Sequence, residues 1–364
     1  MNFLLKKDDM KGHIPLHAQA RTALRRMIDE QFEDGQQFLT EAALTKHLGV
    51  SLITVRRAVA DLAHDGLLDR RGARGTFVVK GQRADVTEFP IGVILPEYES
   101  PVTISLLNQI ARSCVERNHR LSVYYAGKGE NAAAVLERTN GCSKYEKLIL
   151  LGNAAATALE LSRMLWERGR QVVNIGSRID DYPGAYIGAD DPEGIRLGLE
   201  HLVGIGHTRI TLLVNEPVEQ GTVASRIHAF DDLTRRQGLN GGRIVYCSTA
   251  IWDDAYSAAY SKMKSIWNGE SRPTAIMTVS DAGAFGALKW LTEQGIGVPD
   301  DISIVGFGDD RTGLHTSPAL TSIGQPYREI AVRAVDLLEA QTIVKRCDLF
   351  KPCLIIRNST KAIG

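Results

Sequence analysis

The sequence contains no long hydrophobic run. The apolar segment at residues 3–5 is followed at once by charged residues and is far too short for a signal peptide. No later segment approaches the roughly 20 consecutive apolar residues that a membrane-spanning helix requires. We therefore expect a chain that is neither secreted nor embedded in a membrane and that works in the cytoplasm.

Cysteine is scarce and follows no pattern. The five cysteines are Cys114, Cys142, Cys247, Cys347 and Cys353, and they form no CxxC pair and have no histidine at ligand spacing. An odd number without a pattern indicates reduced, structural thiols, as in a reducing compartment. The sequence therefore predicts no metal site and no cofactor.

A net charge of one sign is also absent, because 43 basic residues balance 43 acidic ones. The balance is uneven along the chain. Residues 1–80 carry 13 Lys+Arg and 10 Asp+Glu, a net charge of +3, which leaves −3 for the remainder. A basic excess at the N-terminus suits the neutralisation of phosphates. With 364 residues, 44% of them hydrophobic and 24% charged, the chain is expected to form two or three globular domains.

Residues 40–79 contain the pattern of two helices joined by a tight turn. Thr40 can cap a first helix, Gly49 supplies a left-handed turn residue, and Ser51 can cap a second helix. The second helix has an apolar stripe at positions i, i+4 and i+7 from Val55, with hydroxyls and arginines on its remaining surface. This pattern predicts a helix-turn-helix, whose second helix enters the major groove of DNA.

Two short strands are expected after the second helix, at residues 67–70 and 76–79, and Asp65-Gly66 should end that helix. The intervening tip, Arg71–Gly75, is flexible and basic, which suits a minor groove or flanking phosphates. The alternative is a small helical bundle with a solvated arginine face. Turn, cap, stripe and strand pair agree in order and spacing, which favours the DNA-binding interpretation.

Residues 14–78 resemble the GntR-type winged helix-turn-helix. Residues 14–31 are expected to form a supporting helix in front of the two helices described above. The family usually has Ser-Glu-Arg where this chain has Thr-Glu-Ala at 40–42, and arginine where it has Leu52. Both missing arginines normally touch DNA, so the operator need not match that of relatives. The family's Gln-Gly at the wing tip is Gly72-Ala73 here. Arg56 keeps its family position and is the favoured base-contacting residue. The predicted DNA-binding residues are Thr40, Glu41, Ser51, Leu52, Ile53, Thr54, Arg56, Arg57, Arg71, Gly72, Arg74 and Gly75.

The character of the sequence changes after a linker at residues 81–89. Apolar strands now alternate with amphipathic helices, which predicts parallel, doubly wound α/β sheets buried on both faces. About 275 residues exceed what one such sheet needs, so two lobes are expected. Strands are predicted near 91–95, 121–125, 147–151, 172–175, 210–214, 244–246, 275–279 and 302–307, and helices at 104–117, 156–168, 192–205, 225–237, 254–268 and 282–294.

Ligands of such sheets bind beyond the carboxyl ends of the strands. The loops there carry carboxylates, amides, an arginine and aromatic rings. Carboxylates and arginine can pair with vicinal hydroxyls, and a tryptophan can cover the apolar face of a sugar ring. The predicted effector-binding residues are Glu97, Tyr98, Asn153, Arg178, Thr222, Arg226, Trp252, Asp281, Gln325 and Tyr327.

Some of these residues have simpler interpretations. Trp252 could lie in the core or start a helix, Arg226 could be solvated, and Asp281 could cap the helix that follows it. Adjacent aspartates recur at 180–181, 190–191 and 309–310, and turns at strand ends explain them better than metal binding does. Gly204-Ile205-Gly206 follows an apolar helical stripe, which predicts a helix end rather than a dinucleotide-binding loop.

Residues 90–360 resemble the effector domain of LacI/GalR-type regulators, which have the type I periplasmic-binding-protein fold. Residues 273–307 carry the most specific match, and residues 200–210 and 318–326 are also typical. The resemblance implies ligand contacts for Arg226, Trp252, Asp281, Gln325 and Tyr327. Ala229 replaces a usual glycine, and Gly176, with Arg178 nearby, replaces an aspartate, so the pocket differs from that of a galactoside repressor.

The two resemblances together predict the domain organisation. A winged helix is expected at residues 1–80, a linker at 81–89, and an effector-binding and dimerisation domain at 90–364. Its first lobe should comprise about 90–188 and 322–343, and its second about 189–321 and 344–364. This pairing is similar to that of the arabinose-responsive repressors and implies an L-arabinose-type effector.

We therefore expect a homodimeric repressor of carbohydrate-utilisation genes that binds double-stranded operator DNA and is released by a monosaccharide. A ligand-dependent activator or a co-repressor-type regulator responding to another sugar, a sugar phosphate or a nucleoside would share these features. A periplasmic sugar-binding protein would need a signal peptide and no winged helix. An α/β enzyme would need a nucleophile, a metal cluster or a cofactor loop, so no enzyme is expected.

Overall fold

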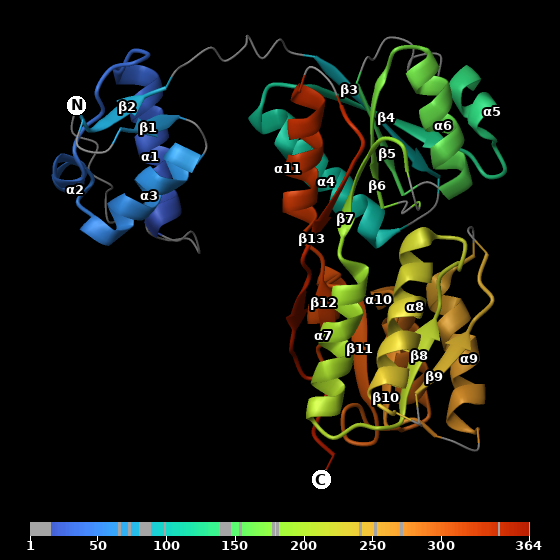
Figure 1. Cartoon of the computed structure of the whole chain (residues 1–364). Coiled ribbons are helices and arrows are strands. Elements are labelled where there is room, and N and C mark those ends of the chain that lie inside the picture. The colour runs from blue at the N-terminus through green and yellow to red at the C-terminus, as the bar shows by residue number, and fades with distance from the viewer. Residues whose placement is uncertain are drawn as a thin grey trace. The chain divides into compact units, whose positions relative to one another are not determined.

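In the computed structural model the chain forms two compact units, Met1–Thr87 and Glu88–Gly364 (Figure 1). None of the described helices is both long and apolar enough to cross a membrane. The structure describes residues 16–64, 67–71, 74–79, 89–97, 100–138, 147–152, 155–176, 179, 182–239, 242–250, 253–269, 272–340 and 343–363.

The first unit contains three helices and a strand pair within its described residues. The elements are α1 (Leu16–Gln31), α2 (Glu41–Leu48), α3 (Leu52–His64), β1 (Leu68–Arg70) and β2 (Thr76–Val78). The predicted caps are confirmed. The Thr40 hydroxyl accepts from the backbone N–H of Ala43, Gly49 ends α2 at φ 69°, and the Ser51 hydroxyl accepts from the N–H of Thr54. The predicted end of α3 at Asp65-Gly66 lies outside the described residues.

The core of the first unit is formed by the apolar stripes of its helices. Val55, Val59 and Leu62 of α3 are buried, and they pack in one cluster with Leu24 of α1 and Leu44 of α2. The strands β1 and β2 pair antiparallel, and the N–H of Phe38 donates to the carbonyl of Thr76 at 2.8 Å. The strand pair is therefore fixed to the segment between α1 and α2, and the predicted winged helix is observed.

The second unit contains two six-stranded sheets with the same strand order. The first sheet is entirely parallel and runs β13-β7-β6-β5-β3-β4. Its strands are β3 (Pro90–Pro96), β4 (Arg120–Ala126), β5 (Lys147–Leu151), β6 (Gln171–Ile175), β7 (Ala185–Ala189) and β13 (Arg346–Phe350). The helices α4 (Pro101–Glu116) and α11 (Tyr327–Glu339) cover one face, and α5 (Ala132–Arg138) and α6 (Ala155–Glu167) cover the other.

The second sheet runs β14-β12-β11-β10-β8-β9. Its strands are β8 (Ile210–Val214), β9 (Arg243–Tyr246), β10 (Ala275–Thr278), β11 (Ser303–Gly308), β12 (Thr321–Gly324) and β14 (Cys353–Ile355). The helices α7 (Asp191–Gly204) and α8 (Gly221–Arg236) cover one face, and α9 (Ala255–Trp267) and α10 (Asp281–Glu293) cover the other. Because both faces are covered, the central strands are apolar on both sides, as the sequence predicted.

Several boundaries differ from the predicted ones. The helix α8 begins at Gly221, four residues before the predicted start at Ser225, because no apolar period marks its first turn. The edge strand β14 runs antiparallel to β12, whereas only parallel strands were predicted. The strand β13 pairs with β7 in the first sheet, although residues from 344 onward were expected in the second lobe. The strand β12 pairs with β11 in the second sheet, although residues from 322 onward were expected in the first lobe.

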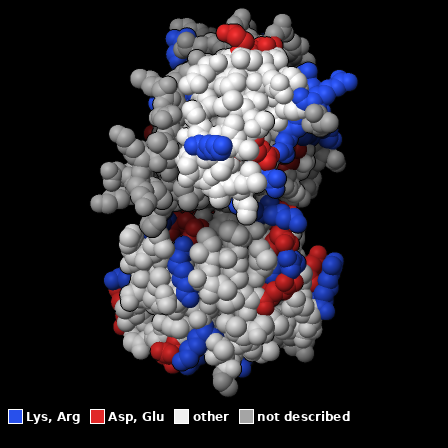
Figure 2. All heavy atoms as spheres, turned by 90° about the vertical axis from the view of Figure 1, so that its left-hand side faces the viewer, with Lys and Arg blue, Asp and Glu red and all other residues white. Residues whose placement is uncertain are grey.

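The surface of the second unit mixes charges of both signs. On α7, Arg196 lies 2.7 Å from Glu193 and 2.5 Å from Glu200. The lower half of Figure 2 shows acidic and basic side chains next to one another on the face that carries α7. The net charge of −3 in residues 81–364 is thus not gathered into one acidic patch on this face.

Gly286 tests the contact between α9 and α10. A Cβ atom added to Gly286 would lie 2.3 Å from the carbonyl oxygen of Tyr256, so α9 and α10 would have to separate. We expect Gly286→Ala to lower the free energy of unfolding by about 1–3 kcal/mol, measured by urea denaturation. Gly204→Ala is the matched control, because Gly204 ends α7 in open space. That control should change stability by less than about 1 kcal/mol or increase it. Equal effects of the two substitutions would contradict this packing.

Candidate functional site

The first unit has one exposed helix face with both basic and apolar side chains. On α3, Ile53, Arg56, Arg57 and Ala60 occupy positions i, i+3, i+4 and i+7 and are all exposed. The buried stripe of α3 lies on the opposite side of the helix. This face is therefore free to meet a partner.

Glu41 joins the exposed face of α3 to the strand pair. Its two carboxylate oxygens accept from Nε of Arg56 at 2.8 Å and from Nη2 of Arg70 at 2.7 Å. The Arg56 side chain is still 63% exposed, so its guanidinium is not packed against its own core. Because arginine has five N–H donors, most of them remain available to a base or phosphate.

The predicted hydroxyl contacts and wing contacts are partly engaged within the unit. Ser51 and Thr54 bond each other at 2.8 Å at the start of α3, so they act first as a cap. In the wing, Nε of Arg71 donates to Asp69 at 2.7 Å, and its guanidinium lies over the Phe77 ring. Arg74 is exposed at the tip.

The backbone of the wing tip is sharply turned. Gly75 has φ 100°, and a Cβ atom there would lie 2.6 Å from the side-chain nitrogen of Gln37. A residue with a side chain would therefore strain this turn and push Gln37 aside. The predicted contact residue Gly72 lies outside the described residues.

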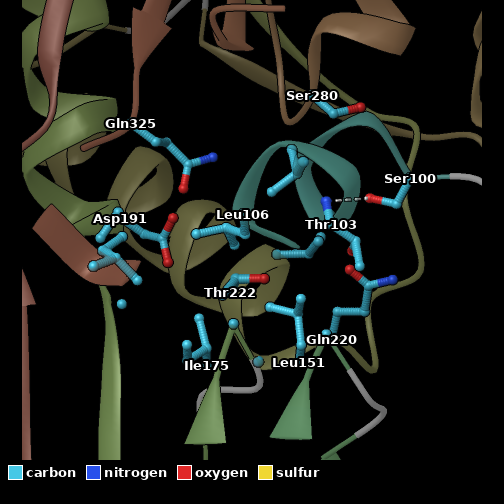
Figure 3. Close-up of a pocket in the computed structure, with 18 of the residues that line it drawn as sticks. Ser100, Thr103, Leu106, Leu151, Ile175, Asp191, Gln220, Thr222, Ser280 and Gln325 are labelled. Carbon is cyan, nitrogen blue, oxygen red and sulfur yellow. Dashed lines mark hydrogen bonds between the residues drawn. The ribbon is translucent and has the colours of Figure 1, made fainter. Parts of the chain in front are cut away.

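In the second unit a cleft lies between the two sheets, where elements of both lobes meet. Its hollow is partly open to solvent and is lined by residues of both lobes. Figure 3 shows Asp191, Thr222 and Gln325 directed toward this hollow from three different elements, with Leu106 beside them. A smaller hollow adjoins it, and Ser100, Val102, Glu216 and Ser280 line both.

Arg226 of α8 is the most strongly held side chain of the cleft. Its Nε and Nη2 both lie 2.8 Å from Oδ1 of Asp191, and its Nη1 donates to the carbonyl of Val279 at 2.6 Å. Its guanidinium also stacks on the ring of Phe307 at 3.8 Å. Both charged side chains are buried, so the arginine is fixed before any ligand arrives. Three of its five N–H groups are used, which leaves two for a ligand.

A polar group of three residues lies beside Arg226, between β8 and α10. The side-chain amide of Asn215 donates to the Ser280 hydroxyl at 2.7 Å. Burial raises the pKa of Glu216, while a hydrogen bond with Ser280 and the charge of Arg226 act in the opposite direction. Glu216 therefore places a partly desolvated carboxyl group at the junction of the two hollows.

Asp281 and Tyr327 line the smaller hollow. The carboxylate of Asp281 accepts from the Ser322 hydroxyl and from the N–H of Asp310, each at 2.6 Å. Burial raises the pKa of Asp281 to about 6 despite these two hydrogen bonds. The hydroxyl of Tyr327 donates to the carbonyl of Gly308 at 2.9 Å, and burial raises the pKa of that hydroxyl.

Bare backbone forms part of the cleft wall in the first lobe. Gly152 and Gly176 end β5 and β6 with φ values of 66° and 78°, conformations that glycine adopts without strain. A Cβ atom on Gly176 would lie 3.8 Å from the Cα of Gly152, so the two turns are adjacent. The first turn of α8, which belongs to the second lobe, also lines the cleft. Gln220 is the N-cap residue of α8, but its side chain does not accept a hydrogen bond from the N–H groups of that turn. These N–H groups can therefore donate to ligand oxygens.

The cleft brings together some of the predicted effector-binding residues. Thr222, Arg226 and Gln325 line the larger hollow, and Asp281 and Tyr327 line the smaller one. Glu97 lines neither hollow and is exposed at the end of β3. Tyr98, Asn153, Arg178 and Trp252 lie outside the described residues.

Two simpler interpretations are wrong. Arg226 is buried rather than solvated. Asp281 does not cap α10, because Ser280 is the N-cap and the Asp281 carboxylate bonds other segments.

Sequence reasoning missed Asp191, the partner of Arg226. The pair at 190–191 was assigned to a turn, which is correct for Asp190, since its side chain accepts from the N–H of Glu193. Asp191 is instead buried in the first turn of α7. Arg226, which compensates the buried charge of Asp191, is distant from it in sequence, so no local pattern marked the pair. Among the described residues, no cluster of His, Cys, Asp or Glu could hold a metal ion.

Comparison with known proteins agrees with the folds of the two units. Residues 16–78 match the model of the bacterial regulatory proteins of the gntR family, and residues 199–360 match the periplasmic binding protein-like domain. The chain joins a gntR-family domain to a periplasmic-binding-protein-like domain. The gntR-family domain contains α1 to β2, and the model of the second domain covers most of the second lobe, including Arg226 and Asp281.

The chain is also similar to curated repressors over most of their length. The chain is 26% identical over 353 residues to an arabinose metabolism transcriptional repressor of Geobacillus stearothermophilus, covering 93% of this chain and 95% of that protein. It is 25% identical over 250 residues to the ribose operon repressor of Escherichia coli, covering 68% and 74%.

Solved structures share the fold of the periplasmic-binding-protein-like domain. A LacI family transcriptional regulator of Enterococcus faecium with bound ribose aligns with a TM-score of 0.65 at 20% identity, over 76% of this chain and all of that one. A lac repressor dimer bound to operator aligns with a TM-score of 0.64 at 22% identity, over 77% of this chain and 97% of that one.

Proposed function

We propose that the chain is a sequence-specific, DNA-binding transcriptional repressor that a small neutral sugar releases from its operator. The fixed Arg226 in a polar cleft between two lobes, on the same chain as an exposed basic recognition helix, carries this proposal. The relatives named as arabinose and ribose repressors support it. We further propose residues 1–80 as the DNA-binding domain, 81–89 as the linker, and 90–364 as the effector-binding domain.

On the DNA side, α3 would enter the major groove with Arg56 directed at a base, most simply guanine. Arg57, the next basic side chain of the same face, would contact bases or phosphates. The wing tip with Arg74 would meet the minor groove or flanking phosphates. Glu41 positions Arg56 from the side of α2 and so restricts the rotamers that Arg56 can adopt.

On the ligand side, the charges of the cleft favour a neutral sugar over a sugar phosphate. Among the described lining residues the acidic side chains are Asp191, Glu216, Asp281 and Asp310, and the basic one is Arg226, already paired with Asp191. A phosphate would meet this excess of negative charge, whereas sugar hydroxyls both donate and accept.

One further donor in the cleft is ready for a ligand. The side-chain nitrogen of Gln325 is buried and has no hydrogen-bond partner among the described residues. A buried donor without a partner is costly, so a ligand oxygen that accepts from it would be bound favourably. With the free N–H groups of Arg226, this supports an arabinose-like monosaccharide.

We propose that two copies of the chain pair through the first lobe. Ile104 and Val115 of α4 are exposed, as are Val123 and Tyr125 of β4, which is an edge strand of the first sheet. Since α4 lies against β4, these side chains can form one apolar surface. A second copy that buries it would set two DNA-binding domains at the spacing of two half-sites.

The end of the linker is fixed to the first lobe, which gives a route for coupling. The Phe89 ring stacks on His119 with 4.0 Å between ring centroids, and Nζ of Lys147 lies 3.8 Å from the centroid of Phe89. If sugar closes the cleft, the first lobe moves and its fixed linker end moves with it. The sugar must favour the closed state by roughly 1–3 kcal/mol to change operator affinity measurably. In this role the protein works in the cytoplasm and turns over no carbohydrate.

A thermal-shift screen of pentoses, hexoses, nucleosides and sugar phosphates tests the ligand class. We expect one or a few neutral sugars, pentoses first, to raise the melting temperature. At about 100 times its dissociation constant, such a ligand adds roughly 2.7 kcal/mol of stability. Stabilisation by sugar phosphates alone would contradict the proposed ligand, and stabilisation by none of the compounds would contradict the proposed sugar site.

A further inference from the structure

The first turn of α3 exposes two large apolar side chains. Ile53 is 79% exposed, the highest value among the large apolar residues of the described chain, and its neighbour Leu52 is 40% exposed. Neither is needed for the core, because Val55, Val59 and Leu62 already fill the contact of α3 with its neighbours. Exposed isoleucine costs hydrophobic free energy that a partner could recover.

The surroundings of Ile53 indicate what kind of partner covers it. Arg56 and Arg57 lie one turn further along the same face, at i+3 and i+4, and Ala60 at i+7 adds little apolar area. A protein partner that buried Ile53 would have to desolvate two arginines as well. A polyanion that carries an apolar group in a groove can pair with both arginines and cover Ile53 at the same time.

In duplex DNA the major-groove edges of the bases offer one apolar group, the C5-methyl of thymine. We propose that Ile53, assisted by Leu52, recognises a thymine methyl group, so that each half-site requires thymine next to the base pair that Arg56 contacts. This inference rests on the proposed DNA-binding function and specifies its sequence preference. Leu52 and Ile53 have no side-chain hydrogen-bond donor or acceptor. Their role in specificity would therefore be to contact the methyl group.

The test removes the methyl group and nothing else. The full-length chain first selects its preferred duplexes from a randomised double-stranded library. In the best duplex, each thymine is then replaced singly by deoxyuridine, and affinity is measured by fluorescence anisotropy. We expect one or two positions in each half-site at which the replacement weakens binding by about fourfold, the ratio that corresponds to burial of one methyl group.

Variants of the protein assign that effect to its residue. Ile53→Ala should bind the thymine duplex more weakly and lose most of its sensitivity to deoxyuridine at the same position. Leu39→Ala is the control, because Leu39 is an exposed apolar residue outside α3, and its 38% exposure is close to the 40% of Leu52. That control should keep the full sensitivity. Circular dichroism establishes that each variant is folded.

The possible outcomes are distinct. If no thymine position responds to deoxyuridine, or if the response persists unchanged in the Ile53→Ala and Leu52→Ala variants, the inference is wrong while DNA binding stands. If the library yields no enriched sequence, the proposed DNA-binding function fails and the inference fails with it. Loss of the deoxyuridine response in Ile53→Ala alone, or in both variants, supports it.

Discussion

Arg226→Ala is expected to lower the free energy of unfolding of the second unit by about 3–5 kcal/mol. The substitution leaves the buried carboxylate of Asp191 without the guanidinium that lies 2.8 Å away. It also removes the hydrogen bond to Val279 and the stacking on Phe307. Urea denaturation measures the change. Arg196→Ala is the control, because Arg196 pairs with Glu193 and Glu200 on the surface of α7, where water screens the charges, and its loss should change stability far less.

Effector binding should be lost together with that stability, and a conservative variant separates the two effects. Arg226→Lys keeps the positive charge opposite Asp191 but lacks the planar fork that bonds Asp191 and Val279 while presenting N–H groups to a ligand. We expect Arg226→Lys to remain folded and to lose the thermal shift produced by the stabilising sugar. Sugar binding equal to that of the unsubstituted protein would remove Arg226 from the proposed site.

Arg56→Ala is expected to weaken operator binding by about 1–3 kcal/mol, or roughly 5- to 150-fold. The 63% exposed side chain is the most direct candidate for a base contact, and Glu41 holds it in place. The thermal shift with sugar should be unchanged, since the cleft lies in the other unit. Anisotropy titration on a selected duplex measures the affinity.

Arg25→Ala is the matched control for Arg56→Ala. It removes the same charge from the same unit, at an exposed position on α1 and so outside the recognition helix α3. We expect the control to change affinity by a small factor that disappears at high salt, because it alters only the general attraction to phosphates. If both substitutions weaken binding equally on selected and random duplexes, Arg56 contacts no base.

Local sequence patterns predicted much of the fold. Thr40, Gly49 and Ser51 are cap and turn residues whose roles depend on their immediate neighbours. The apolar strands and amphipathic helices of the second unit were predicted for the same reason. The lobe that contains β13 was predicted wrongly, because it depends on where a late segment crosses back to the first sheet.

The cleft was only partly predictable. Strand-end loops and family resemblance pointed to Arg226 and Gln325, and the structure places both in the larger hollow. Asp191 was missed because a buried ion pair joins residues that are distant in sequence. The early start of α8 at Gly221 was missed because a helix terminus at a cleft carries no apolar stripe.

Sugar bound in the cleft should control operator binding by the other unit. This control is tested most directly by titrating the full-length chain onto its selected duplex, with and without a saturating concentration of the stabilising sugar. We expect sugar to lower the affinity by roughly 5- to 150-fold, the equivalent of 1–3 kcal/mol of coupling. An affinity that sugar leaves unchanged, or increases, would contradict it.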